Sequence, residues 1–323
     1  MTDLAAALFY TGPGQAEIRE VTLPPLSEGW VEVETIASAL SRGTERLVFN
    51  GQIPQSEFQR MAAPFQSGEF PFPVKYGYSA VGRVVAGPKD LEGQPVFCLY
   101  PHQSRFRVPA SAVIPLPEGV PPSRAVLGAN AETALNAIWD AAPKPGTRVL
   151  VVGAGLLGCL IAAFLSRRGD LSVCAMDVLA LRGAIFSDFN VRFMSATECP
   201  EPCVQAFHTS ASSAGLESAI NALAPEGEVI ELSWYGDKTV SISLGGSFHS
   251  QRLSIRASQV GQIARARRAS TTHAERLSAA LSHLADPRLD ALITEEVAFS
   301  ELPAALPRLL GADADGIATR IVY

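Results

Sequence analysis

The stretch VLVVGAGLLGCLIAAFL, residues Val149–Leu165, decides the fold of this chain. It carries no charged side chain, so a membrane span has to be weighed against a buried core segment. A spanning helix needs about 20 apolar residues, and glycines at Gly153, Gly155 and Gly158 interrupt this run. RVLVV is short and β-branched like a buried parallel strand, whereas LLGCLIAAFLSRRG favours a helix that stops at Gly169. The stretch therefore predicts strand, glycine turn and helix.

The three glycines have the spacing GxGxxG, which between a strand and a helix is the dinucleotide-binding fingerprint. The first glycine permits the tight turn, the second lets the backbone approach a pyrophosphate, and the third lets the helix pack close to the strand. The helix N-terminus then offers free N–H groups to the phosphates. The expected phosphate-binding residues are Gly153, Gly155, Leu156, Leu157 and Gly158.

The next strand, LSVCAMD, ends in Asp177, about 20 residues after the last glycine, where a carboxylate accepts hydrogen bonds from the adenosine ribose. The same carboxylate would repel a 2′-phosphate, and no basic residue follows until Arg182. NAD is therefore favoured over NADP. The alternative is that Asp177 only caps a helix or turn. His208, at the end of a later strand, is expected near the cofactor.

The middle of the chain alternates strands and helices. VRFMSA, VQAFHTS, EVIELSWY and LSIRASQV are predicted strands, and with the first two they make six. LALRGAIFSDF and AGLESAINALAP are predicted helices between them. This pattern predicts a doubly wound α/β domain over residues 121–263. The strand at 253–260 would lie at the sheet edge, and an exposed apolar edge must be covered or paired.

The flanking residues have a different pattern. VEVETIAS, YSAVGRVVAG, QPVFCLYP and SRFRVPASAVIPLP are short alternating segments bounded by Gly and Pro, which is typical of a mostly antiparallel barrel. The C-terminal segment adds one amphipathic helix, THAERLSAALSHLA, and a terminal strand, GIATRIVY. We therefore predict a second domain made of residues 1–120 and 264–323.

Composition excludes several classes of protein. The 323 residues carry a net charge of −6, which argues against a nucleic-acid partner, and the one basic run, RARRASTTHAER, is expected to be solvated. Five scattered cysteines are typical of a reducing, cytoplasmic compartment. The N-terminus MTDLAAALFY lacks the features of a secretory signal. We expect a small-molecule substrate and no membrane partner.

Taken together, the chain resembles the medium-chain dehydrogenase/reductase family, the zinc-containing alcohol dehydrogenase and quinone oxidoreductase superfamily. The resemblance covers essentially the whole length and rests on SRGTERLVFNG, YGYSAVGRVVAG, LPEGVPPSRAVLGANAETALNAI and PKPGTRVLVVGAGLLG. It implies a GroES-like catalytic barrel with an inserted Rossmann domain. It also implies a homodimer through the edge strand at 253–260, because such edges meet across a two-fold axis in that family. In wording, ANAETALNAIWD, LYPHQSRFRVP and SQVG are most similar to the branch of bacteriochlorophyllide a dehydrogenase.

The departures from that family concern its catalytic zinc. Where the family places a ligand cysteine, this chain has Ser41 and Arg42, and Tyr78 and Ala129 stand at or near the other two ligand positions. The lobe of four closely spaced cysteines is also missing from the sequence. We expect no zinc, because a catalytic site needs three protein ligands. An improvised ligand set would be Glu45, His102 and Glu132.

Without zinc, the proton chemistry must come from other side chains. Thr44 matches the family's relay hydroxyl, or is a turn residue. Tyr78 is a candidate proton relay, or a packed barrel tyrosine. His102 is a candidate base near the substrate cleft, or a surface-turn histidine. Glu45 and Glu132 are candidate bases, although the resemblance implies that acidic residues here often pair with arginine, and Arg42 is available.

The function expected from these features is a zinc-independent, NAD-linked oxidoreductase that interconverts a secondary alcohol and a carbonyl on an apolar small molecule. Phe58, Phe65, Phe70 and Phe72 lie on a long segment that either lines an apolar pocket or covers the barrel core. A quinone or enone reductase is the first alternative, and Asp177 counts against it because such members usually prefer NADPH. The second is a cofactor-binding protein without turnover.

Overall fold

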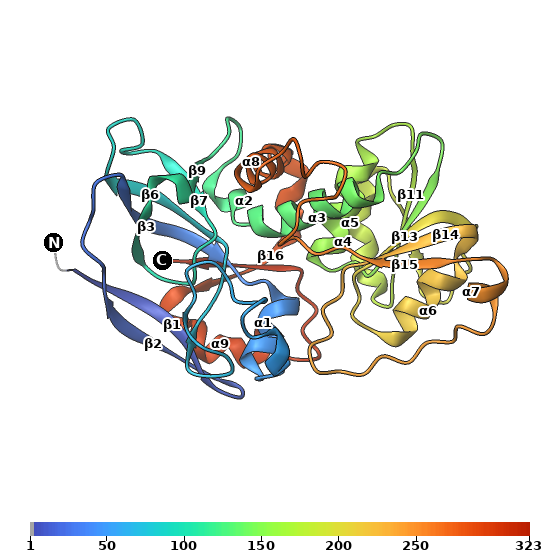
Figure 1. Cartoon of the computed structure of the whole chain (residues 1–323), viewed down its shortest axis with the longest axis horizontal. Helices are drawn as coiled ribbons and strands as arrows, with labels where there is room; N and C mark the ends of the chain where they lie inside the picture. The colour runs from blue at the N-terminus through green and yellow to red at the C-terminus, as the bar shows by residue number, and fades with distance from the viewer. Residues whose placement is uncertain (1–2) are drawn as a thin grey trace. The chain divides into compact units, whose positions relative to one another are not determined.

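The computed structural model describes residues 3–323, which form two compact units (Figure 1). The first contains the residues up to Ala129 together with Leu284–Tyr323, and the second is Asn130–His283. The predicted boundaries, at 120/121 and 263/264, differ from this division. Residues 264–283 belong to the second unit, because Arg276 of helix α8 (His273–His283) is buried against that unit's own residues. Within residues 3–323, no helix is long and apolar enough to cross a membrane.

The second unit contains a six-stranded parallel sheet. Its order is β12-β11-β10-β13-β14-β15, the arrangement of doubly wound dinucleotide-binding domains. The six predicted strands are thereby confirmed. Their bounds are Arg148–Val152 (β10), Ser172–Asp177 (β11), Arg192–Ser195 (β12), Cys203–His208 (β13), Leu223–Glu231 (β14) and Ser254–Ala257 (β15).

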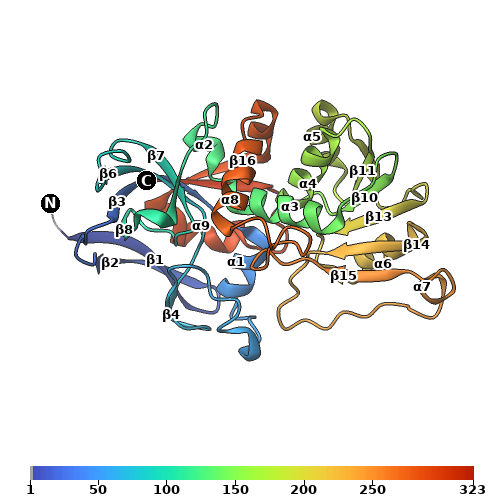
Figure 2. The same cartoon turned by 45° about the horizontal axis from the view of Figure 1, so that its top comes forward.

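Helices cover both faces of this sheet. The crossover from β10 to β11 through α4 (Leu156–Ser166) and the crossover from β13 to β14 through α6 (Ser213–Asn221) run in opposite directions. Because such crossovers are right-handed, α4 and α6 pack on opposite faces (Figure 2). The helix predicted at 179–189 is present as a continuous helical run over residues 180–189 made of three consecutive pieces, and Asn190 ends it in a left-handed conformation. These pieces are Ala180–Arg182 (η3), Gly183–Phe186 (α5) and Ser187–Phe189 (η4); α3 (Gly128–Ala141) and α7 (Ser247–Ser250) complete the helices.

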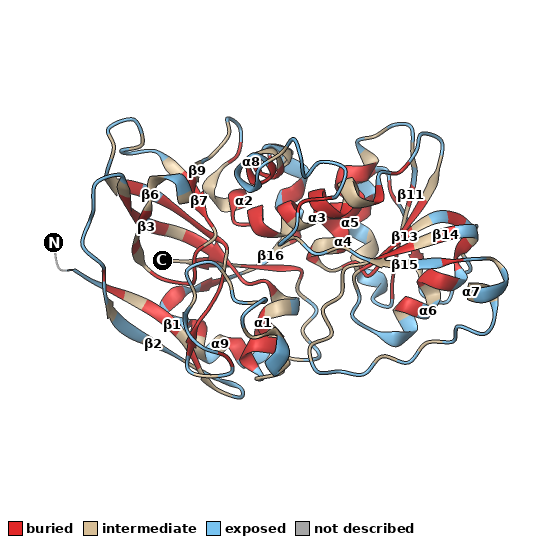
Figure 3. Cartoon of the chain, in the orientation of Figure 1, coloured by how far each residue is buried: buried red, intermediate tan, exposed pale blue. Residues whose placement is uncertain are grey.

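The first unit is the predicted barrel. Its two sheets have the orders β2-β1-β5-β4 and β16-β17-β3-β6-β7-β9, with β8 paired to β3. Among the described pairs only β16–β17 is parallel, and buried residues follow β3 and β6 (Figure 3). The strands are Leu4–Gly12 (β1), Gln15–Thr22 (β2), Trp30–Ala39 (β3), Ser67–Gly68 (β4), Val74–Lys75 (β5), Ala80–Ala86 (β6), Pro95–Cys98 (β7), Arg105–Pro109 (β8), Val113–Pro115 (β9), Ile293–Ala298 (β16) and Ala318–Val322 (β17). The helices are Arg42–Phe49 (α1), Gln55–Glu57 (η1), Ala110–Ala112 (η2), Pro122–Ala125 (α2), Pro287–Leu292 (η5), Phe299–Glu301 (η6) and Leu302–Leu309 (α9).

The aromatic segment after α1 packs largely on this barrel. Phe70 is buried between Phe58 and Tyr76, with ring centroids 5.8 and 5.6 Å away. Phe65 lies 5.4 Å from Tyr100 but remains 41% exposed. The segment was expected either to line an apolar pocket or to cover the barrel core. Phe70 covers the core, whereas the Phe65 ring remains partly exposed at the surface.

Candidate functional site

Three glycines shape the turn between β10 and α4, each for a different reason. Gly153 has φ +103°, and a Cβ there would lie 2.7 Å from Thr209 Oγ1. A Cβ on Gly158 would lie 1.8 Å from the carbonyl oxygen of Gly153, so the helix packs directly on the turn. Gly155 has an ordinary φ of −75°, and a Cβ there would meet no atom within 4 Å. The first and third glycines serve packing, and the second keeps a space open.

The first turn of α4 faces that space with backbone donors. Gly155 is the N-cap residue of α4 and has no side chain that could bond to the N–H groups of the first turn. Leu156 and Leu157 are the first two residues of the helix. The first four N–H groups of a helix have no partner within the helix, and they carry a partial positive charge that favours anions. An open space bounded by these donors fits the pyrophosphate of a dinucleotide.

Asp177 ends β11 beside the same turn and is 9% exposed. Its Oδ2 accepts from the Ala154 N–H at 2.6 Å, and its Oδ1 accepts from the Leu179 N–H at 2.8 Å. Arg182 lies 3.2 Å from Oδ2. The carboxylate therefore anchors the glycine turn itself, in addition to standing where a ribose-binding carboxylate is expected. The sequence did not reveal that Arg182 reaches back to Asp177.

His208 occupies the end of β13, next to β10 in the sheet. Its ring is wholly buried, with Nδ1 2.8 Å from Glu231 Oε2 and Nε2 2.7 Å from Ser210 Oγ. Both ring nitrogens are thus bonded within the protein. The ring itself has no exposed surface, Ser210 is exposed, and the expectation that His208 lies near the cofactor stays a prediction.

Three hydroxyl groups meet in the first unit at the start of α1. Ser41 precedes this helix, Thr44 lies in its first turn, and both side chains hydrogen-bond to the side chain of Tyr78, which lies between β5 and β6. Burial raises the pKa of Tyr78 to about 12, although the two hydrogen bonds act in the opposite direction. We call Ser41, Thr44 and Tyr78 the hydroxyl cluster. Sequence reasoning named Thr44 and Tyr78 but missed Ser41, whose spacing of three residues from Thr44 was the available signal.

Glu45 and His102 lie beneath this cluster with no exposed surface. Glu45 Oε2 accepts from the Tyr10 hydroxyl at 2.6 Å and lies 3.0 Å from His102 Nε2, while Oε1 accepts from the Ser41 N–H at 2.7 Å. Burial raises the pKa of Glu45, but His102 and Tyr10 outweigh it, so the pKa lies below its ordinary value. His102 is therefore a core histidine paired with Glu45, so the surface-turn reading is wrong, while its role as a base stays a prediction.

Glu132, on α3 of the second unit, is also paired. Arg276 lies 3.0 Å from its Oε1, and both side chains are almost fully buried. Burial raises the pKa of Glu132, and Arg276 opposes that rise only in part. The expected arginine partner is present but is Arg276. Arg42 instead donates to the carbonyl groups of Ala314 and Gly316.

The side chains at the family's zinc positions do not fit a zinc ion. Ser41, Tyr78 and Ala129 provide no thiolate, imidazole or carboxylate, the ligands that zinc takes in proteins. In residues 3–323, no group of three or more His, Cys, Asp or Glu side chains is arranged to hold a metal ion. The improvised set is not assembled either, since Glu45 bonds to His102 whereas Glu132 bonds to Arg276.

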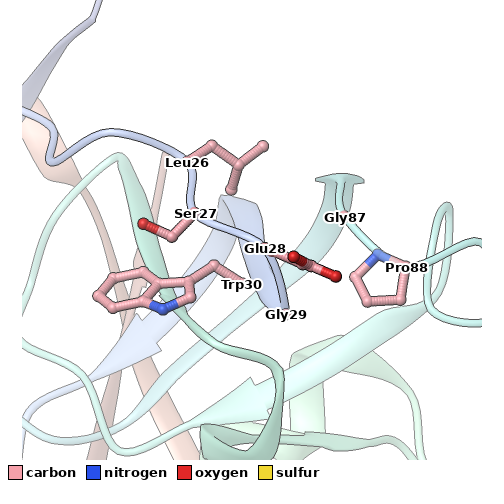
Figure 4. Close-up of a pocket in the computed structure, with 7 residues that line it drawn as sticks. All are labelled: Leu26, Ser27, Glu28, Gly29, Trp30, Gly87 and Pro88. Carbon is pink, nitrogen blue, oxygen red and sulfur yellow. The ribbon is translucent and has the colours of Figure 1, made fainter.

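A surface pocket of about 420 Å³ lies elsewhere in the first unit (Figure 4). Its walls contain none of the predicted site residues and no titratable group besides Glu28. We therefore assign no site chemistry to it. The lining residues are Leu26, Ser27, Glu28, Gly29, Trp30, Gly87 and Pro88.

Comparison with known proteins places this geometry in context. No protein-family model matches the sequence. Over 273 residues, 78% of this chain and 80% of the relative, the chain is 24% identical to 2-desacetyl-2-hydroxyethyl bacteriochlorophyllide A dehydrogenase of Cereibacter sphaeroides.

Two solved structures share the fold over nearly their whole length. A short-chain alcohol dehydrogenase of Escherichia coli CFT073 in complex with NADH superposes with a TM-score of 0.77 at 15% identity, covering 99% of this chain and 100% of that one. A putative zinc-binding dehydrogenase of Sinorhizobium meliloti 1021 bound to NADP superposes with a TM-score of 0.78 at 14% sequence identity, covering 99% of both chains.

One of the two solved structures holds NADH and the other NADP, so they do not distinguish NAD from NADP for this chain. The curated relative is of the kind that the sequence wording indicated, and the barrel and the inserted parallel sheet are those of the solved dehydrogenases. The expected resemblance is confirmed, and the chain has the architecture of the medium-chain dehydrogenase/reductase family.

Proposed function

We propose that this chain is a nicotinamide-linked oxidoreductase that interconverts a secondary alcohol and a carbonyl on an apolar small molecule, with a tyrosine hydroxyl in place of a catalytic metal. The observation that carries the proposal is the hydroxyl cluster, which includes two of the positions where the resembling family holds its zinc. The fold and the name of the curated relative support a dehydrogenase.

The cofactor half of this function rests on the second unit. A nicotinamide, when bound, supplies or accepts the hydride. The open space at Gly155 and the first turn of α4 would bind the pyrophosphate, and Asp177 would accept hydrogen bonds from the ribose. We propose NAD(H) as the preferred cofactor, because the Asp177 carboxylate would repel a 2′-phosphate. Arg182 offsets this repulsion only in part, since its guanidinium already pairs with Asp177.

Tyr78 suits the role of proton donor to a carbonyl oxygen. With a pKa of about 12, its hydroxyl is protonated at neutral pH and can donate a hydrogen bond to the substrate. As negative charge develops on the carbonyl oxygen, the emerging alkoxide is a stronger base than a phenolate, so the proton passes to it. Ser41 and Thr44 then stabilise the tyrosine oxygen. The reverse sequence removes the proton from an alcohol.

Glu45 and His102 act in this scheme as positioning residues. Glu45 follows Thr44 directly and accepts from the Ser41 N–H, so it holds the helix turn that carries both hydroxyl groups. His102 and Tyr10 fix the carboxylate in turn. Since Glu45 and His102 have no exposed surface, neither is assigned contact with substrate.

The test compares wild-type protein, free of added metal and treated with a chelator, with Tyr78→Phe. Secondary alcohols are supplied with NAD⁺, and NADH formation is followed. Loss of a general acid–base group predicts a fall in kcat of about 10²- to 10⁴-fold, with little change in NADH affinity. Tyr76→Phe is the matched control, because that buried tyrosine has its ring centroid 5.9 Å from the Tyr78 ring. It should keep activity near the wild-type level.

Two results would overturn the proposal. The first is activity that the chelator abolishes and zinc restores. The second is a Tyr78→Phe enzyme that oxidises alcohols at the wild-type rate. Enone reduction unaffected by Tyr78→Phe would favour the quinone or enone reductase instead, and NAD binding without turnover of any substrate would favour a cofactor-binding protein.

We also propose that the protein is a homodimer formed through β15. This strand ends the six-stranded sheet, so one of its edges has no neighbouring strand within that sheet. An open edge of this kind is stabilised by pairing with a second chain. Sedimentation equilibrium should give twice the chain mass of 34.2 kDa, and replacing Ile255 by proline should give the monomer mass. A monomeric wild-type protein would refute this proposal.

A further inference from the structure

One polar cluster of the second unit lies beside the glycine turn, where a Cβ on Gly153 would be 2.9 Å from the Ser210 nitrogen, and hydride transfer makes no use of its acid–base chemistry. It lies where β13 and β14 end, and it joins Ser210, His208 and Glu231 in a line. His208 Nε2 lies 2.7 Å from Ser210 Oγ, and Nδ1 lies 2.8 Å from Glu231 Oε2. A hydroxyl, an imidazole and a carboxylate at these distances are the parts of an activated serine.

The carboxylate end of this line is firmly held. Glu231 Oε1 accepts from the Ser233 N–H at 2.7 Å, and Oε2 accepts from the Tyr235 hydroxyl at 3.2 Å. Burial raises the pKa of Glu231, but hydrogen bonds from His208 and Ser233 outweigh it, so the pKa is lowered. An ionised carboxylate requires His208 Nδ1 to carry the proton. Nε2 is then the acceptor for the Ser210 hydroxyl.

The hydroxyl end of the line is accessible. Ser210 is exposed, whereas His208 beneath it is wholly buried. The first turn of α6 also crowds Ser210: a Cβ on Gly215 would lie 2.1 Å from Ser210 Oγ and 3.0 Å from His208 Nε2. The close approach therefore depends on glycine. It brings the first turn of α6 close to the nucleophile Ser210 Oγ, with the Gly215 N–H donating to Ser212 Oγ at 3.0 Å.

We propose that Ser210, His208 and Glu231 form a second reactive site, at which Ser210 takes acyl groups from small carboxylic esters. Ser210 Oγ forms a bond to the acyl carbon as the ester C–O bond breaks. The serine proton passes to His208 Nε2 and then to the departing alcohol. Water repeats the sequence at the acyl-serine, releasing the carboxylic acid and restoring the hydroxyl.

The first experiment labels the full-length protein with a fluorophosphonate. Ser210 Oγ should form a bond to phosphorus as fluoride leaves, and peptide mass spectrometry should find one phosphonyl group on Ser210. Ser213, the exposed first residue of α6, is the internal control. The expected result is selective modification of Ser210. Equal or faster modification of Ser213 would overturn the proposal, and this comparison is made within the wild-type protein.

The second experiment tests the relay. The acetyl ester of p-nitrophenol should show a burst of p-nitrophenol that Ser210→Ala abolishes and Ser213→Ala leaves unchanged. His208→Gln and Glu231→Gln, each checked for a wild-type circular dichroism spectrum, should slow labelling about 10²-fold or more. Labelling at the wild-type rate in a folded His208→Gln protein would overturn the proposal. Because the two proposals rest on different residues, either proposal can fail while the other stands.

Discussion

Gly155 offers a sharp test of the dinucleotide site, because its substitution separates binding from folding. Its φ of −75° is one that alanine adopts without strain, and an added Cβ would meet no protein atom within 4 Å. Gly155→Ala should therefore leave the folded protein intact. The new methyl group would instead project into the space assigned to the pyrophosphate.

The expected loss of binding follows from that overlap. Forcing a methyl group into a packed contact costs about 1–3 kcal/mol, and each 1.4 kcal/mol changes an equilibrium constant about tenfold. NADH should consequently bind Gly155→Ala roughly 5- to 150-fold more weakly than wild-type protein. Fluorescence titration with NADH measures this ratio without any knowledge of the substrate.

Two further glycines supply matched controls. In Gly158→Ala the new Cβ would have to move from 1.8 Å to at least 3.0 Å from the Gly153 oxygen, displacing α4. A cost of about 3 kcal/mol would lower Tm by about 6–12 °C. The Cβ of Gly169→Ala would meet no atom within 4 Å, so this substitution should change neither the NADH affinity nor Tm. Wild-type NADH affinity in a folded Gly155→Ala protein would refute the reasoning.

Three other predictions concern charged residues. Asp177→Asn keeps an oxygen for the Ala154 N–H but removes the negative charge. The affinity for NADPH relative to NADH should therefore rise about tenfold, or about 1.4 kcal/mol. An unchanged affinity ratio in fluorescence titrations would contradict the role given to this carboxylate. Arg276→Met leaves Glu132 buried without its cation and should cost about 3–5 kcal/mol of unfolding free energy at neutral pH. Because burial already raises the pKa of Glu132, this deficit should shrink in thermal melts as the pH falls and the carboxyl is protonated, and a deficit constant with pH would argue against the ion pair as its cause. Glu45 has a lowered pKa, so its stabilising effect is complete above the unfolded value of about 4.3 and is lost as the pH falls through the lower folded value. Glu45→Gln should remove that part of the acid dependence of Tm, and an identical acid dependence in the two proteins would exclude it.

The cofactor turn was predictable from sequence because its determinants are local. The strand, Gly153, Gly155, Gly158 and the helix are contiguous in the chain, and Gly158 packs on the Gly153 carbonyl of the same turn. Asp177 was found by its distance along the chain from the turn. The same local rules predicted the helix at residues 179–189, which the structure has as consecutive 3-10 and α-helical turns over residues 180–189.

The state of the polar side chains was not predictable in the same way. His102 lies in a polar stretch that indicates a turn, yet it is buried against Glu45, 57 residues earlier in the chain. Glu132 has its partner at Arg276, 144 residues later. Such pairs are selected by where the folded backbone places two distant positions, and a single sequence carries no local signal for them.

By itself, then, the sequence determined the two-part architecture, the dinucleotide turn and the loss of the family's zinc-ligand residues, because strand and helix periodicity and glycine spacing act over a few neighbouring residues. Only the tertiary structure decided what stands in place of those ligands. It joined Ser41 and Thr44 of α1 to Tyr78 from another part of the barrel, and it placed Glu45 and His102 out of reach beneath them. Burial and hydrogen bonding, which set the charge and reactivity of these groups, exist only once the barrel has closed around them.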